Sequence, residues 1–252
     1  MDSYPADTLV HYLTIPDCHG PALQAERVSI EDAHMYLWGG ESDDMRFDIT
    51  QWALDECLLS KGQGREDFKA LLQPTYSPSS GQEMSFSDTE RCLILQSDGC
   101  TKAYPFQTML SHEVINEVAD GEPVMIAYCV LADLAEVYSR TYCGQDLTFA
   151  VSGYTYADPG FCDGVDEQCI GIRAFILWDR ETESLWWPLI DEGVSGLMRD
   201  THLINHTSSE WEVITWAEVL SKYPDALVLD SGQGMETPQD WPRLLESDLD
   251  CN

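Results

Sequence analysis

The sequence predicts an α+β fold in which a strand-rich antiparallel sheet, or barrel-like core, carries a few helices. Seven short apolar runs between turn residues have the length and composition of β-strands. Two segments with helical spacing of apolar residues interrupt this series. Short strands with little helix between them favour an antiparallel sheet folded on itself.

The predicted strands follow a loop rich in Pro, Ser and Gly at residues 74–81. They cover residues 92–96, 124–129, 136–140, 147–154, 173–178, 184–189 and 227–229. A helix is predicted over residues 106–119, because most apolar side chains there fall on one helical face and Asp120-Gly121 can end it. Further helices are predicted over residues 215–222 and 48–59.

These elements divide the chain into three parts. Residues 1–66 are predicted to be an N-terminal extension that packs on the core, because proline and glycine interrupt their short apolar stretches. Residues 67–232 form the predicted strand-rich core domain, and residues 233–252 form an acidic C-terminal tail.

The net charge of the chain disfavours some classes of binding partner. The 252 residues carry 13 Lys and Arg against 45 Asp and Glu, a formal net charge of -32. This field disfavours binding to nucleic acid and to anionic membranes, since both need basic side chains. The excess carboxylates are typical of a solvated surface, and attraction of a cationic partner is the alternative.

No apolar run reaches the roughly 18 residues of a membrane span, and the first residues lack the features of a secretory signal. We therefore expect a soluble, cytoplasmic protein whose nine cysteines are mostly reduced. The sequence lacks the motifs typical of dinucleotide binding, of P-loop phosphate binding, of zincin metalloproteases and of the hydrolase nucleophile elbow.

Two clusters could carry chemistry. Helical spacing would place His112 and Asn116 one turn apart on a polar face, where the imidazole could move a proton or bind a metal. An ordinary solvated helix face is the alternative. Cys129 ends an apolar strand that could approach His112, although a buried structural cysteine explains it equally.

Two other segments have simpler explanations. Cys162 and Cys169 flank an acidic turn, and their spacing favours a disulfide-closed loop or unrelated thiols over a zinc site. Residues 178–188 read as a β-hairpin whose aromatic strands flank a charged turn.

The clusters, in this order, resemble the bacterial and archaeal family called domain of unknown function 3179, over about residues 67–232. The similarity rests on FKALLQP at 68–74, KAYP at 102–105, HEVIN at 112–116, YC at 128–129, FAVSG at 149–153, DRETESLW at 179–186 and TWAE at 215–218. The chain retains the family positions of His112 and Cys129. The resemblance implies no established reaction.

The chain departs from the family pattern at three places. Ser111 replaces a tryptophan, and the sequence after Cys129 lacks the second thiol of a Cys-Pro-Leu-Cys run. An insertion containing Cys162 and Cys169 follows Tyr156-Ala157-Asp158. A redox pair of the Cys-x-x-Cys type is therefore excluded at Cys129.

The first hypothesis for function is a metal- or thiol-dependent enzyme, such as an oxidoreductase, that acts on a small molecule through His112 and Cys129. Glu113 and Asn116 would orient the imidazole, and copper, zinc or iron would suit these ligands. A tight metal site would need a further ligand from Cys143, Cys162, Cys169 or His206. The substrate-binding residues would be Ser152, Tyr156, Asp179 and Trp186. The second hypothesis is a non-catalytic accessory protein that binds a ligand or metal.

Overall fold

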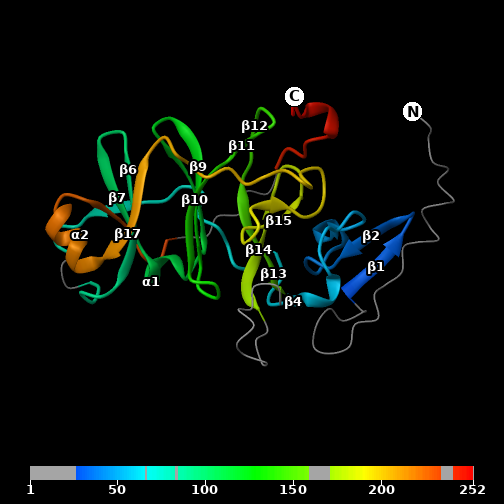
Figure 1. Cartoon of the computed structure of the whole chain (residues 1–252), viewed down its shortest axis with the longest axis horizontal. Helices are drawn as coiled ribbons and strands as arrows, with labels where there is room; N and C mark the ends of the chain where they lie inside the picture. The colour runs from blue at the N-terminus through cyan, green and yellow to red at the C-terminus, as the bar shows by residue number, and fades with distance from the viewer. Residues whose placement is uncertain (1–26, 66, 83–84, 159–170, 234–240, 252) are drawn as a thin grey trace. The chain divides into compact units, whose positions relative to one another are not determined.

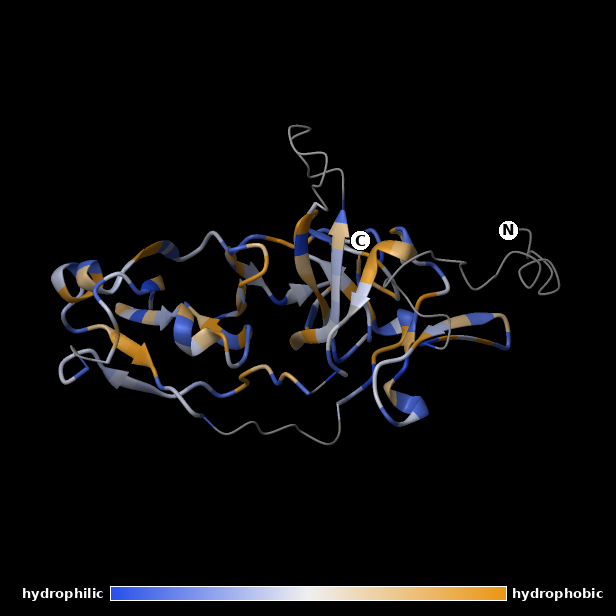
Figure 2. Ribbon diagram, turned by 90° about the horizontal axis from the view of Figure 1, so that it is seen from below, coloured by the Kyte–Doolittle hydropathy of each residue, from blue (hydrophilic) through white to orange (hydrophobic). Residues whose placement is uncertain are grey.

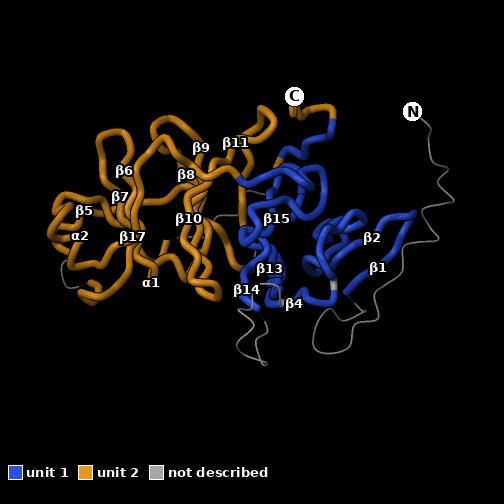
Figure 3. Tube along the Cα trace, in the orientation of Figure 1, with its two compact units in different colours: residues 1–67, 151–203, 242–246 blue, residues 68–150, 204–241, 247–252 orange. Residues whose placement is uncertain are grey.

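The computed structural model describes residues 27–65, 67–82, 85–158, 171–233 and 241–251. Contacts divide the chain into two compact units, coloured separately in Figure 3. Unit 1 contains the described residues of 1–67, 151–203 and 242–246, and unit 2 contains those of 68–150, 204–241 and 247–252. Cys162 and Cys169 lie outside the described residues.

Unit 2 is built around a five-stranded sheet in the order β17-β6-β7-β18-β5. Figure 1 labels β6, β7 and β17 of this sheet. Its neighbouring strands are antiparallel except β18 and β7, which run parallel. The strands are β5 (Tyr76–Pro78), β6 (Arg91–Ser97), β7 (Cys100–Pro105), β17 (Glu210–Thr215) and β18 (Leu227–Leu229).

A second antiparallel sheet of unit 2 has the order β10-β9-β8. Two short helices and a two-stranded ribbon complete the unit. These elements are β8 (Val114–Ala119), β9 (Glu122–Cys129), β10 (Leu134–Ser139), β11 (Thr141–Tyr142), β12 (Gln145–Asp146), α1 (Phe106–Met109) and α2 (Trp216–Lys222).

Strand β6 shows why the large sheet of unit 2 is covered on both faces. Leu93 and Leu95 point into a core shared with β8, β9 and α1. The alternate residues Cys92 and Ile94 pack with Trp216 of α2 on the other face. Because successive side chains of a strand point to opposite faces, this continuous apolar run stabilises both layers.

Unit 1 contains an antiparallel sheet of β1 (Val28–Glu31), β2 (His34–Leu37) and β3 (Phe47–Asp48). Its second sheet has the order β16-β15-β14-β13-β4. The strands of that sheet are β4 (Leu59–Lys61), β13 (Phe149–Asp158), β14 (Ile172–Asp179), β15 (Leu185–Trp187) and β16 (Glu192–Gly193), of which β13 starts within unit 2. Apolar residues, orange in Figure 2, recur along the strands of both units.

Short 3-10 turns occur between or after these strands. They are η3 (Asp43–Met45), η4 (Glu56–Leu58) and η6 (Glu246–Asp248). The prediction of a helix over residues 48–59 is therefore wrong, because this segment contains only one short 3-10 turn between strands.

The predicted strand-rich antiparallel core is confirmed, but the α+β class is not: the described residues form a mostly-β protein with several antiparallel sheets, in which the helices α1 and α2 are both short. The barrel-like core is a correction: the described strands form separate sheets and no closed barrel. The predicted boundaries at residues 66 and 232 stay predictions. Within the described residues, no helix has the length and apolar character needed to cross a membrane.

The two helix predictions around the core have opposite outcomes. Helix α2 is confirmed, and a capping box between Thr215 and Glu218 fixes its start. The predicted helix over residues 106–119 is wrong after α1, because its second half is strand β8. The β-branched residues Val114 and Ile115 pair with β9 in the register Val114↔Ala127, where burial on a sheet favours them over helix.

Candidate functional site

A tight turn between α1 and β8 places the first predicted site residues. Its centre is Glu113, whose φ of 58° lies in the left-handed region. The N–H of Val114 donates to the carbonyl of His112 at 2.7 Å, which makes this a three-residue turn. The N–H of Tyr128 donates to the Glu113 carbonyl at 2.8 Å, so that β9 holds the turn against the end of β8.

His112 has a fixed orientation and tautomer. Its side chain is buried, and Nδ1 lies 2.9 Å from the carbonyl oxygen of Lys69. A carbonyl only accepts, so Nδ1 carries the proton and Nε2 of the neutral ring is the acceptor. His112 is therefore held with one nitrogen able to accept a proton or to bind a ligand.

Glu113 is the group in this turn with altered acidity. Burial raises the pKa of its carboxyl group from 4.5 to about 7. Among the described residues, nothing donates a hydrogen bond to this carboxyl group and no basic side chain pairs with it. A carboxyl group with this pKa can either donate or accept a proton near neutral pH.

Asn116 has a structural role in β8. Its amide nitrogen donates to the Phe149 carbonyl at 2.8 Å, and its amide oxygen accepts from the Phe149 N–H at 2.8 Å. The placement of His112 and Asn116 on one helical face is wrong, because the residues from Val114 onward are extended. The amide of Asn116 instead pairs with the backbone of Phe149, the first residue of β13.

Cys129 is the last residue of β9 and is fully buried. The β8–β9 ladder ends at Val114↔Ala127, and the Tyr128-to-Glu113 hydrogen bond extends the pairing by one residue. His112 and Cys129 therefore lie at the same end of this hairpin. Neither of the two pockets described below is lined by Cys129.

Of the four residues predicted as a third metal ligand, Cys143 and His206 lie in the described part of the chain. Cys143 forms a disulfide with Cys251, which removes its thiol as a ligand. His206 bonds through Nε2 to Ser209 at 2.9 Å. No group of three His, Cys, Asp or Glu side chains that could hold a metal occurs in the part of the chain that the structure describes. Metal binding by His112 and Cys129 stays a prediction.

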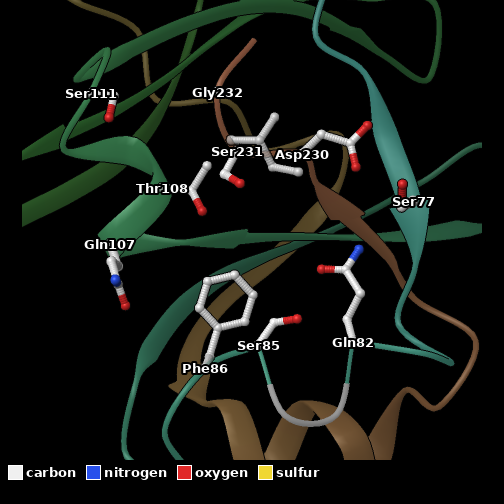
Figure 4. A pocket seen from close by; sticks show the side chains of 11 residues that line it. Ser77, Gln82, Ser85, Phe86, Gln107, Thr108, Ser111, Asp230, Ser231 and Gly232 are labelled. Carbon is white, nitrogen blue, oxygen red and sulfur yellow. The ribbon is translucent and has the colours of Figure 1, made fainter.

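A pocket of about 450 Å³ lies beside α1 in unit 2 (Figure 4). Three separate segments of the chain contribute to it, and the helix provides Gln107 and Thr108. The full lining is Ser77, Gln82, Ser85, Phe86, Gln107, Thr108, Ser111, Leu229, Asp230, Ser231 and Gly232. Ser111 connects the pocket to the turn that carries His112.

Most polar side chains of this pocket form no hydrogen bond with another described residue. No side-chain hydrogen bond to another described residue is formed by Ser77, Gln82, Ser85, Gln107, Thr108, Ser111 or Ser231. The residue Thr108 is only 6% exposed, and it lines the pocket. Figure 4 shows Gln82 and Phe86 projecting toward Thr108 and Ser231.

Two lining residues are held by neighbours outside the pocket. Asp230 accepts a hydrogen bond from the hydroxyl of Thr75 at 2.9 Å. The ring of Phe86 packs edge-on against Trp216, with 5.1 Å between the ring centroids. The pocket therefore combines one fixed aromatic ring with many polar groups that can bind water or a ligand.

The predicted substrate-binding residues belong to unit 1. Ser152 donates to the carbonyl of Ile176 at 2.7 Å, and the hydroxyl of Tyr156 accepts from the N–H of Asp55 at 3.2 Å. Asp179 is fully buried and accepts from Thr182 at 2.7 Å and from the indole of Trp186 at 2.9 Å. All four side chains make internal contacts that stabilise their own unit.

Burial raises the pKa of Asp179 from 3.8 to about 7, against the hydrogen bonds from Trp186 and Thr182, which lower it. The desolvation of the carboxylate is thus only partly offset by its three donors. Asp179 holds the turn of the predicted hairpin, in which the β14–β15 pairing of Trp178 with Leu185 is confirmed.

Unit 1 has its own pocket of about 500 Å³. His34 Nδ1 lies 2.7 Å from Asp48, and the Thr50 hydroxyl donates to the same carboxylate at 2.5 Å. The remaining lining is Gln51, Thr182, Glu183, Gly196, Leu197, Arg199, Asp200 and Glu246. Most of its charged groups pair with one another or with nearby arginines, as Glu183 does with Arg65 and Arg243.

One buried cluster was missed from the sequence. Glu117 of β8 accepts hydrogen bonds from the hydroxyls of Tyr76 and Tyr104, each at 2.5 Å, and it pairs with Lys102. Burial is the largest cause that raises the pKa of Tyr104. Tyr104 and Lys102 stand in the KAYP motif, so the motif signalled these residues without indicating their partner.

Comparisons with known proteins support the family resemblance for part of the chain. The model of a family described as "Protein of unknown function (DUF3179)" matches residues 65–163. The chain therefore contains a domain of that family over these residues, which include His112, Glu113, Asn116 and Cys129. No curated protein and no solved structure matches this chain.

Proposed function

We propose that unit 2 binds a small molecule in the pocket beside α1, as a ligand-binding accessory protein. One observation carries the proposal: seven polar side chains line the pocket, and none of them bonds to another described side chain or backbone group. Polar side chains in a concave site that form no bond within the protein are available to bond with a ligand.

The energetics support this assignment. A hydroxyl in a pocket that bonds to no other described residue, such as that of Thr108, must bond to water or to a ligand, because an unmade hydrogen bond is costly. Direct bonds to a ligand replace bonds to several ordered waters, which the ligand returns to bulk solvent.

Side-chain amide resonances of the full-length protein test the proposal. Pools of small metabolites at millimolar concentration should shift the amide signals of Gln82 and Gln107, which line the pocket of unit 2. The amide of Gln51, in the pocket of unit 1, serves as the internal control. Pools that leave the Gln82 and Gln107 signals unchanged contradict the proposal.

A second candidate function is a thiol- or metal-dependent enzyme that acts on a small molecule at the α1–β8 turn. It is supported by the combination of a carboxyl group with a pKa of about 7 at Glu113 and an adjacent imidazole of fixed tautomer at His112. Groups of this kind move protons at neutral pH. Cys129 would supply the thiolate or a metal ligand.

Elemental analysis of the purified protein distinguishes a metal-dependent enzyme from a thiol-dependent one. Stoichiometric copper, zinc or iron that is lost in both His112→Ala and Cys129→Ala supports a metal-dependent enzyme. A metal-free wild type contradicts that form. The thiol-dependent form requires Cys129 to react with iodoacetamide at least as fast as Cys100, and it is contradicted when Cys129 stays unmodified in the folded protein.

A further inference from the structure

We infer that the pocket of unit 2 takes a neutral, polyhydroxylated ring, such as a monosaccharide or a cyclitol. This inference rests on the proposed function and adds the chemical class of the ligand. Three features of the pocket support it: its charge, its hydrogen-bonding groups and its single aromatic ring.

The charge of the lining disfavours ionic ligands. The lining contains no Lys, Arg or His, so an anion would find no cationic partner. The net charge of -32 also repels anions at long range. Asp230 is the one carboxylate in the lining, and Thr75 already donates to it. A cation would therefore gain one shared carboxylate and lose much of its hydration.

The hydrogen-bonding groups match hydroxyls on a ligand. The hydroxyls of Ser85, Thr108 and Ser231 can each donate and accept, and the amides of Gln82 and Gln107 supply both kinds of group. A sugar hydroxyl also donates and accepts, so it can bond to such a lining without leaving a buried group unpaired. A ligand with only acceptors, or only donors, would satisfy fewer of these side chains.

The aromatic ring of Phe86 provides an apolar surface among these polar groups. Its edge-on contact with Trp216 holds the ring in place, and the buried side chain of Leu229 adds aliphatic lining. The C–H face of a sugar ring is apolar and can pack against such a surface. The volume of about 450 Å³ is within the range of small-molecule sites.

The test is a titration of the full-length protein, followed by the amide signals of Gln82 and Gln107. The neutral probes are D-glucose and myo-inositol, and the charged counterparts are D-gluconate and D-glucosamine. Cyclohexanol, which lacks all but one hydroxyl, tests the contribution of the hydroxyls. We expect a neutral polyol to bind at least about tenfold more tightly than the other probes.

Two variants test whether the neutral polyol binds in this pocket. Phe86→Ala and Thr108→Val should each weaken binding of the neutral polyol by about tenfold. Thr89→Val is the matched control, because Thr89 is exposed and does not line the pocket. Urea unfolding of each variant verifies that it is folded.

The outcomes separate this inference from the proposed function. Charged or apolar probes that shift the two glutamine amides more strongly than the neutral polyols overturn the ligand class and leave small-molecule binding intact. The class is also overturned when polyol binding is unaffected by both pocket variants. When neither these probes nor the metabolite pools shift the signals, the proposed function itself fails.

Discussion

The two pockets differ in what their polar groups bind. In unit 1 most of these groups bond to other residues of the protein, as His34 does to Asp48, Thr182 to Asp179 and Glu183 to Arg65. In unit 2 the corresponding hydroxyls and amides bond to no other described residue. Polar side chains of the first kind contribute to folding stability, whereas those of the second kind remain available for a ligand.

The largest effect on stability is expected at Glu117, a buried carboxylate that bonds to two tyrosine hydroxyls and to Lys102. Glu117→Ala removes the partner of Lys102 and of two tyrosine hydroxyls, and it should lower the free energy of unfolding by about 3–5 kcal/mol. Asp133→Ala is the matched control, because its pair with Arg91 is exposed and should contribute less than about 1 kcal/mol. Urea unfolding measures both, and equal losses would contradict the prediction.

The pH dependence of stability should identify Asp179 in unit 1. The pKa of Asp179 is about 7 in the folded protein and 3.8 in the reference state. The folded protein therefore keeps the proton at pH values where the unfolded chain has lost it. The contribution to stability falls as the pH rises from about 4 to about 7, by on the order of 4 kcal/mol, and is constant above that range.

Asp179→Asn should remove this decline, as urea unfolding at several pH values would show. Glu113→Gln is the control in unit 2, because the raised pKa of Glu113 acts in the same direction. A wild-type protein whose stability increases between about pH 5 and pH 7, after correction with both variants, would contradict the assignment.

A pair of threonine substitutions gives a direct comparison of the two pockets. Thr182→Val in unit 1 removes a hydroxyl that bonds to Asp179 and Ser184, and it should cost about 1–3 kcal/mol of stability. Thr108→Val in unit 2 removes a hydroxyl with no partner among the described residues, and it should change stability by less than about 0.5 kcal/mol. Thermal unfolding of the two variants would show similar losses if the comparison were wrong.

The smallest effect is expected for the exposed pair of His34 and Asp48. Both side chains are about half exposed, so water screens their interaction. His34→Ala should lower the free energy of unfolding by less than about 1 kcal/mol. A loss comparable with that of Glu117→Ala would show that the pair is coupled to the rest of unit 1.

The strands could be predicted where an apolar run is bounded by turn residues, as in β6, β9 and β14. Strand β8 could not, because it is buried on both faces and its apolar residues imitate a helical stripe. Only the pairing with β9, which is a tertiary contact, determines that Val114 and Ile115 are extended.

The candidate site was predictable only in part. The HEVIN and YC motifs indicated His112 and Cys129, and the structure places both at the same end of one hairpin. The pocket beside α1 gave no such signal, because its lining comes from segments near Ser77, Thr108 and Asp230 that are distant in sequence. Serine, threonine and glutamine are common on any surface, so their convergence depends on the fold.

The disulfide between Cys143 and Cys251 joins two positions that are 108 residues apart. It encloses most of the second half of the chain in a covalent ring. A protease that cuts once anywhere inside this ring leaves the two fragments attached. The nicked protein would therefore migrate as one species in non-reducing electrophoresis and separate into two bands only after addition of dithiothreitol.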